Sequence, residues 1–150
     1  MVEIDSSTIL VKPINDRSDS ELTRTYSILI SQLNNTTVTS QKHVLDNEIS
    51  QAMKDLIHDK YHMQYKLAPP GCHRRNAAEV TIRNFKCHFL IILAGVADNF
   101  PLQLWDKLTS QVETTLNLMQ VSRINPNISA YEAIWSPYDW NRFSLAPPGC

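Results

Sequence analysis

The chain has 150 residues, of which 43% are hydrophobic and 19% are charged, and it carries a formal net charge of −1 at pH 7. This length is enough to bury one hydrophobic core but excludes two full-sized domains. No run of about 18 apolar residues could span a bilayer, and the start "MVEIDSSTIL" lacks the basic and apolar segments of a signal peptide. We therefore expect an intracellular protein, nuclear or cytoplasmic, with no transmembrane segment.

The near-neutral total hides an uneven distribution of charge. Residues 1–53 hold seven acidic residues against four Lys or Arg, whereas residues 54–88 hold seven Lys or Arg, three acidic residues and four His. This asymmetry predicts a basic face in the middle of the chain. The three Cys residues form no Cys-x-x-Cys pair, so reduced thiols are expected rather than a disulfide framework.

The first half of the chain alternates between strand and helix patterns. Short β-branched or alternating runs predict three strands, at residues 7–13, 42–46 and 61–67. Apolar residues at helical spacing predict two helices between them, at residues 18–33 and 48–57. Ser18 and Glu21 form a potential capping box for the first helix. This β-α-β-α-β order implies an α/β layer with parallel crossovers.

The second half of the chain has a different pattern. Pro-Pro-Gly predicts a loop over residues 68–76, and helical spacing then predicts two amphipathic helices, at residues 76–95 and 101–119. From residue 122 the chain is rich in Pro, Asn, Tyr and Trp, with one short helical pattern at "SAYEAIW". We therefore divide the chain into a core, residues 1–121, and a helical or irregular C-terminal arm, residues 122–150.

The hexapeptide "LAPPGC" occurs twice, at residues 67–72 and 145–150. The first copy continues into sequence that has no equivalent elsewhere in the chain, and no internal repeat of a useful period accompanies the two copies. Pro-Pro-Gly is ordinary turn chemistry. We interpret the two copies as a shared turn sequence rather than as a duplicated domain.

Two acidic residues, Asp46 and Glu79, stand where α/β proteins often carry catalytic groups. Asp46 ends a predicted strand, and Glu79 begins a long predicted helix after a basic loop. Two converging carboxylates suit Mg²⁺, which takes one or two protein carboxylates and leaves room for phosphates. Arg83 and Lys86 follow on the same predicted helix face as phosphate contacts. Ordinary helix capping and dipole effects also explain both acids, so spacing alone leaves the two interpretations open.

Longer segments of the chain resemble a known family. "VLDNEIS", "HRRNAAEVTIRNFKCHFL" and "FPLQLWDKLTSQVETTLNLMQVSRINPNISAY" together resemble the integrase catalytic core of LTR retrotransposon polyproteins, which are D-D-E polynucleotidyl transferases. The similarity extends over nearly the whole chain. It implies an α/β, ribonuclease-H-like core with an incomplete mixed sheet, and Mg²⁺-dependent DNA strand transfer as the ancestral activity. DNA is the expected partner, with assembly into a homo-oligomer as a further option.

The resemblance also implies roles for individual residues. Asp46 corresponds to the family's second catalytic Asp and Glu79 to its catalytic Glu, and both would bind Mg²⁺ in a two-metal site. The family's helix beyond the Glu lies against DNA, which implies that Arg83 and Lys86 contact phosphates.

The family's first catalytic Asp has no counterpart in the expected place. It lies on the family's opening strand, whereas residues 7–13 resemble a later strand, and the nearest acid, Asp5, falls in the turn before them. Because the first Asp contacts both metal ions, its loss should weaken metal binding by Asp46 and Glu79. We therefore expect an N-terminally truncated integrase core that binds DNA and is inactive alone. The alternative is a non-catalytic module that binds nucleic acid or protein through the same basic face.

Other residues have competing interpretations. His73, Arg74 and Arg75 are either a solvated loop or phosphate contacts beside Glu79. A zinc site is the weakest alternative, because none of the common ligand spacings is met. Its candidate ligands would be His58, His62, Cys72, His73, Cys87 and His88. We interpret the three Trp residues as core and interface anchors rather than base-stacking platforms, because no basic residues alternate with them.

Overall fold

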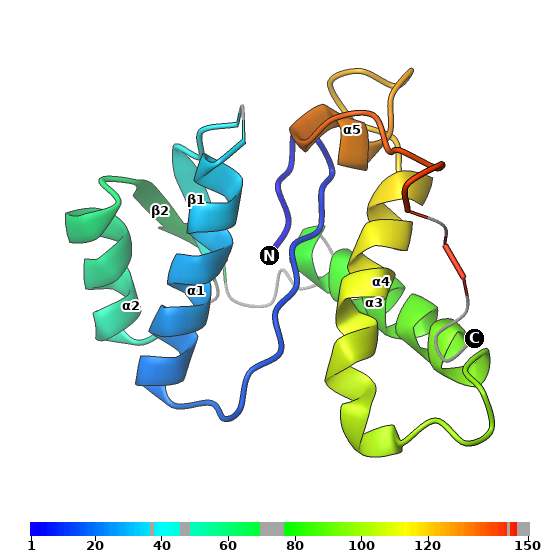
Figure 1. The fold of residues 1–150 in the computed structure, drawn as a ribbon. Coiled ribbons are helices and arrows are strands. Elements are labelled where there is room, and N and C mark those ends of the chain that lie inside the picture. Colours follow the sequence, from blue (N-terminus) through cyan, green and yellow to red (C-terminus); the bar gives the residue numbers. More distant parts are fainter. Residues whose placement is uncertain (37, 46–48, 70–76, 144, 147–150) are drawn as a thin grey trace. The chain divides into compact units, whose positions relative to one another are not determined.

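The structure, a computed structural model, describes residues 1–36, 38–45, 49–69, 77–143 and 145–146. The chain divides into two compact units: residues 14–76 form one, and residues 1–13 together with 77–150 form the other (Figure 1). Over the described residues the protein is mixed α/β, with five α-helices and one two-stranded parallel sheet. No helix in this part of the chain is long and apolar enough to cross a membrane.

The unit of residues 14–76 begins with α1 (Asp19–Asn34), which confirms the first predicted helix. The Ser18 hydroxyl accepts a hydrogen bond from the Glu21 N–H at 3.3 Å and so caps the helix. The Glu21 carboxylate pairs with Arg24 at 2.7 Å, so only the Ser18 half of the predicted capping box forms. One face of α1 is buried: Thr25, Leu29, Ile30 and Leu33.

The sheet of this unit pairs β1 (Lys42–Leu45) with β2 (Gln64–Leu67) in parallel. The prediction of strands in these two regions is therefore confirmed. The second strand begins at Gln64 rather than at residue 61, because His62 has a positive φ of 52° that interrupts the extended backbone.

A two-part helical segment connects the strands, where the sequence predicts a helix over residues 48–57. It consists of α2 (Gln51–Asp55), capped by the Ser50 hydroxyl, and the π-helix η1 (Leu56–Lys60). Met53 and Ile57 point their apolar side chains into the interior of the unit and are buried. Burial of these two side chains against the sheet and α1 explains why so short a helical segment is stable.

The prediction of a strand at residues 7–13 is wrong. This segment forms a single antiparallel bridge, between Val2 and Ile9, and belongs to the unit of residues 77–150. Its backbone is bound by helix side chains in place of a neighbouring strand: the Asn117 side chain accepts from the Ile9 N–H and donates to the Ile9 carbonyl, both at 2.8 Å. The predicted β-α-β-α-β order is therefore wrong, since β-branched residues favour extended backbone without specifying its partner.

The second unit is built on two long helices, α3 (Ala77–Ala94) and α4 (Trp105–Met119), and both were predicted. α3 ends at Gly95, whose N–H donates to the Ile91 and Ile92 carbonyls. A short 3-10 helix, η3 (Leu102–Leu104), leads into α4. One buried cluster of the unit contains Ile9, Val112 and Leu116, with Val11, Phe85, Phe89 and Ile92 packed against it.

The C-terminal arm, residues 122–150, is partly ordered by a short helix, α5 (Ala130–Ile134). Ser129 and Glu132 form a complete capping box at its start. Ala130 and Ile134 are buried, and the Ala130 carbonyl accepts a hydrogen bond from the Thr8 hydroxyl at 2.8 Å. The interpretation of the three Trp residues as core and interface anchors has two parts. The core part is wrong, because all three are exposed: Trp105, Trp135 and Trp140. The interface part stays a prediction.

Candidate functional site

The candidate site lies on the exposed side of α3. Glu79 stands in the first turn of the helix, where the N–H dipoles of the helix start favour a negative charge. Arg83 and Lys86 follow one and two turns later, so the helical repeat alone brings the three charged residues onto neighbouring turns. All three are exposed.

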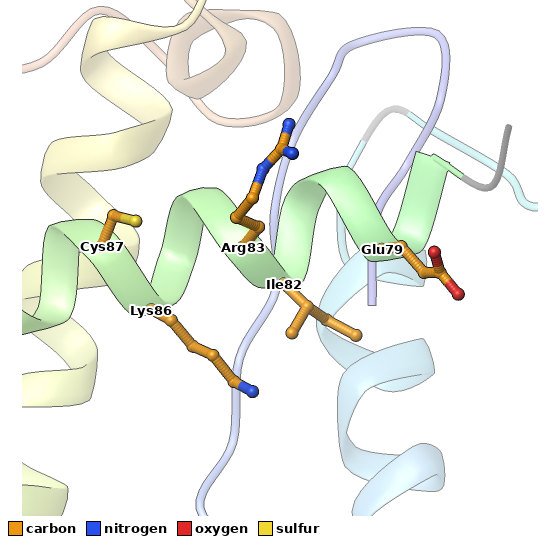
Figure 2. Close-up of a pocket in the computed structure, with 5 residues that line it drawn as sticks. All are labelled: Glu79, Ile82, Arg83, Lys86 and Cys87. Carbon is orange, nitrogen blue, oxygen red and sulfur yellow. The ribbon is translucent and has the colours of Figure 1, made fainter. Parts of the chain in front are cut away.

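These residues line one open pocket with a volume of about 440 Å³, together with Ile82 and Cys87. Figure 2 shows Ile82 between the Glu79 and Lys86 side chains, whereas Arg83 and Cys87 project from the other edge of the helix. The surface of the pocket is mostly apolar, and the side chains that line it include one carboxylate and two cations. The sequence singled out the three charged residues and considered Cys87 only as a zinc ligand. Ile82 carried no functional signal, because apolar residues are ordinary on an amphipathic helix.

Four of the residues predicted from the sequence lie outside the described residues: Asp46, His73, Arg74 and Arg75. β1 ends at Leu45, the residue before Asp46, so the predicted strand is confirmed as far as Leu45. His73, Arg74 and Arg75 precede α3 closely in the sequence. The convergence of Asp46 with Glu79 therefore stays a prediction.

Asp5 lies in a turn over residues 4–6, as the sequence predicted. Its N–H donates to the Glu3 carboxylate at 3.1 Å, and its carbonyl accepts from the Ile124 N–H at 3.1 Å. The Glu3 carboxylate also accepts from the Ser6 N–H at 2.6 Å. Backbone contacts hold the turn, and the Asp5 residue is exposed.

The residues considered for zinc have other surroundings. The described residues include no group of three or more His, Cys, Asp or Glu that could hold a metal ion. His58 is exposed and lies 2.8 Å from the Asp59 carboxylate, whereas His88 hydrogen-bonds the Thr115 hydroxyl at 2.7 Å between α3 and α4. Partial burial lowers the pKa of His88 below its ordinary value. Cys72 and His73 lie in the part of the chain that is not described.

Sequence reasoning missed a second group of polar residues, on α4. The Glu113 carboxylate accepts a hydrogen bond from the Val11 N–H at 2.8 Å. Glu113 lies one helical turn before Asn117, whose side chain hydrogen-bonds Ile9. Burial raises the pKa of Glu113, and the Val11 N–H opposes this shift. Glu113 and Asn117 stand four residues apart on the apolar face of this helix. Because a buried polar group requires a partner, this spacing was the sequence signal that could have identified both residues.

Comparison with known proteins identifies no family for this chain. A scan against protein-family models found no match, and a search of curated proteins found no significant match.

Proposed function

We propose that the chain is part of the catalytic core of an LTR-retrotransposon integrase and that α3 binds the phosphate backbone of DNA. The observation that carries the proposal is the pocket on α3, which places Glu79, Arg83 and Lys86 on successive turns around one open surface. The sequence segments that resemble the integrase family include this helix and the start of α5.

The cations of this pocket suit a phosphate backbone. Arg83 and Lys86 are exposed, so their charges are available to a polyanion, and three further basic residues, 73–75, precede the helix. Lys and Arg contacts with phosphates supply most of the sequence-independent affinity for DNA. An apolar floor beside the cations also suits the sugar edges of a nucleic-acid strand.

The acidic part of the site fits a hard cation. Glu79 offers an exposed carboxylate at the start of α3, and the oxygen of such a carboxylate is a normal Mg²⁺ ligand. Glu79 would hold Mg²⁺ together with Asp46, and the ion would activate an attacking hydroxyl and stabilise charge at the phosphodiester. Because the family's first Asp has no counterpart, we propose that this chain alone binds DNA without cleaving it.

The local topology supports the same family. β1, the α2 and η1 helices, and β2 form a parallel β-α-β unit, and the long α3 is the next helix along the chain. A parallel strand that runs up to the proposed catalytic Asp, followed by a helix that begins with the proposed catalytic Glu, is the order that a ribonuclease-H-like core requires.

DNA binding by the purified chain tests the proposal. Substitution of both Arg83 and Lys86 by Ala should weaken binding to duplex DNA of any sequence, and should reduce the slope of log K against log salt concentration by about 2. Fluorescence anisotropy of a labelled duplex at several salt concentrations measures both quantities.

The matched control is Lys107→Ala, which removes an exposed cation from α4 in the same unit. This variant should bind DNA as the unmodified chain does. Equal binding by the double variant and the unmodified chain would contradict the assignment of α3 to DNA.

A further inference from the structure

Residues 1–13, here called the N-terminal segment, belong to one compact unit with residues 77–150. The chain does not lead directly from the segment to these residues, because residues 14–76 form a separate compact unit between them. In Figure 1 the segment is drawn in dark blue, and the helices that bind it, α4 and α5, are drawn in yellow and orange. The covalent link between the segment and these helices therefore runs through the whole of another unit.

Side chains and backbone groups of α4 and α5 bind the segment through hydrogen bonds. Asn117 binds the Ile9 backbone, and Glu113 binds the Val11 N–H, each at 2.8 Å. The Thr8 hydroxyl donates to a carbonyl at the start of α5, also at 2.8 Å. All these partners belong to residues 77–150, so a chain that supplies only this part offers the segment a complete set of hydrogen bonds.

Apolar burial holds the same part of the segment. Thr8, Ile9 and Leu10 are 0%, 2% and 1% exposed, and Ile9 packs in one cluster with Val112 and Leu116. Burial of two large aliphatic side chains is a main source of favourable free energy for docking. Because the segment binds by its own side chains and backbone, the surface that it covers is specific for this sequence.

The chain that follows the segment can act as a hinge. Residues 14–18 are exposed and form no regular secondary structure before α1 begins at Asp19. The hydrogen bonds of this stretch are local: the Asn15 N–H donates to the Glu21 carboxylate at 3.3 Å, and the Ser18 N–H donates to the Asp16 carboxylate at 2.8 Å. The chain can therefore change direction here while the contacts of residues 8–11 stay as they are.

Docking in the same chain and docking in a second copy bury the same side chains and form the same hydrogen bonds. The two forms differ in the hinge residues and in the effective concentration that the tether gives to the segment. Short flexible linkers give effective concentrations in roughly the millimolar range, and longer tethers give lower ones. Docking between copies therefore competes with docking in the same chain as the protein concentration rises.

We propose that two copies of the chain exchange their N-terminal segments, so that the segment of each copy docks on α4 and α5 of the other. Each copy gives one segment and receives one, so reciprocal exchange forms a closed, symmetric dimer that leaves no docking surface empty. The proposal rests on contacts within one unit and is independent of DNA binding by α3.

Refolding tests whether the dimer forms. The full chain is unfolded in urea and refolded at a series of protein concentrations, with a reductant present because Cys87 is exposed. Sedimentation velocity should show a dimer fraction that rises with the concentration during refolding. This dimer should persist after dilution, because its dissociation requires that the buried Ile9 and Leu10 leave the core. A chain that stays monomeric up to the millimolar range would overturn the proposal.

An isotope-labelled mixture tests whether the segments are exchanged. One sample of the unmodified chain carries ¹³C only in its Ile methyl groups and another only in its Val methyl groups, and the two are unfolded and refolded together. A nuclear Overhauser effect between labelled methyl groups of Ile9 and Val112 then requires two chains. We expect it in the dimer fraction and not in the monomer fraction. A dimer without this signal would associate through another surface and would overturn the proposal.

The rate of dissociation tests the role of the segment in the dimer. Thr8→Val keeps the shape of the side chain but removes its hydrogen bond to the Ala130 carbonyl. The purified dimer of this variant should revert to monomer about tenfold faster than the unmodified dimer. Ser110→Ala, at an exposed position on α4, is the matched control and should dissociate at the unmodified rate. Equal rates for Thr8→Val and the unmodified chain would contradict exchange of this segment.

Discussion

Side chains of α4 form the backbone hydrogen bonds that a neighbouring strand would otherwise form with the N-terminal segment. Asn117 is fully buried, and its amide uses one donor and one acceptor on the same residue, Ile9. The amide of an Asn offers the same donor and acceptor pair as a backbone peptide group. The N-terminal segment is therefore paired as if it lay beside a strand, although its neighbour is a helix.

Substitution of Asn117 by Leu should leave the Ile9 N–H and carbonyl buried without partners. Each orphaned group costs about 1 to 3 kcal/mol, so the loss of partners for two groups should lower the free energy of unfolding by roughly 2 to 6 kcal/mol. Urea unfolding followed by circular dichroism measures the loss. Ser110→Ala, at an exposed position on the same helix, serves as the control and should change stability little. Equal stability of the two variants would exclude this role for Asn117.

Glu113 should make stability depend on pH. Burial raises its pKa above the ordinary value of 4.5, while the Val11 N–H, the Met1 α-amine and Lys12 oppose the shift. Between the unfolded and the raised folded pKa, the folded chain binds more protons than the unfolded chain, so stability falls as pH rises through this window.

Comparison with Glu113→Gln isolates that contribution. As pH rises from 4.5 through the raised pKa, the unmodified chain should lose stability relative to the variant. Chemical denaturation at a series of pH values gives this difference. A constant difference would contradict any shift in the pKa of Glu113, and a difference that moves the other way would show that its pKa is lowered rather than raised.

At the scale of elements, periodicity predicted the helices and failed for the N-terminal segment. The apolar positions of α1, α3 and α4 recur every three to four residues, and this repeat identifies a helix whatever it packs against. The same repeat places Glu79, Arg83 and Lys86 on successive turns of α3, where all three line one pocket although Arg83 and Lys86 project from different edges of the helix. Residues 7–13 carry no such information, because their extended backbone is a local preference whereas its partner, α4, is about 100 residues away.

The N-terminal segment should act as a separable part of its unit. Ile9 and Leu10 are 2% and 1% exposed, and Ile9 belongs to the core cluster with Val112. A fragment of residues 77–150 should therefore be poorly folded, because its core lacks this cover. Addition of a peptide of residues 1–13 should raise its helix content in a saturable way, as circular dichroism would record.

A peptide with Asn in place of Ile9 serves as the control, because it places a polar side chain in the core. It should not restore helix content. A fragment that is fully helical without any added peptide would show that residues 1–13 do not contribute to the core.

At the scale of the whole molecule, the proposed activity depends on a complete set of carboxylates. The chain alone should not nick plasmid DNA in the presence of Mg²⁺, because the first Asp of the family has no counterpart. Agarose gel analysis of supercoiled plasmid tests this expectation. Nicking that is lost in Glu79→Gln and retained in Asp98→Asn, an exposed acid beyond α3, would show an active site and contradict the expected inactivity.

The division into units has a consequence for synthesis on the ribosome. Residues 1–13 leave the ribosome about 100 residues ahead of their partners Glu113 and Asn117. At roughly 5 to 20 residues per second, the apolar N-terminal segment waits for about 5 to 20 seconds without its partner. Residues 14–76 need no later residue to complete their sheet, so that unit can fold during the wait. Residues 1–13 are therefore synthesised well before α4 but reach their final place only after α4 has been made.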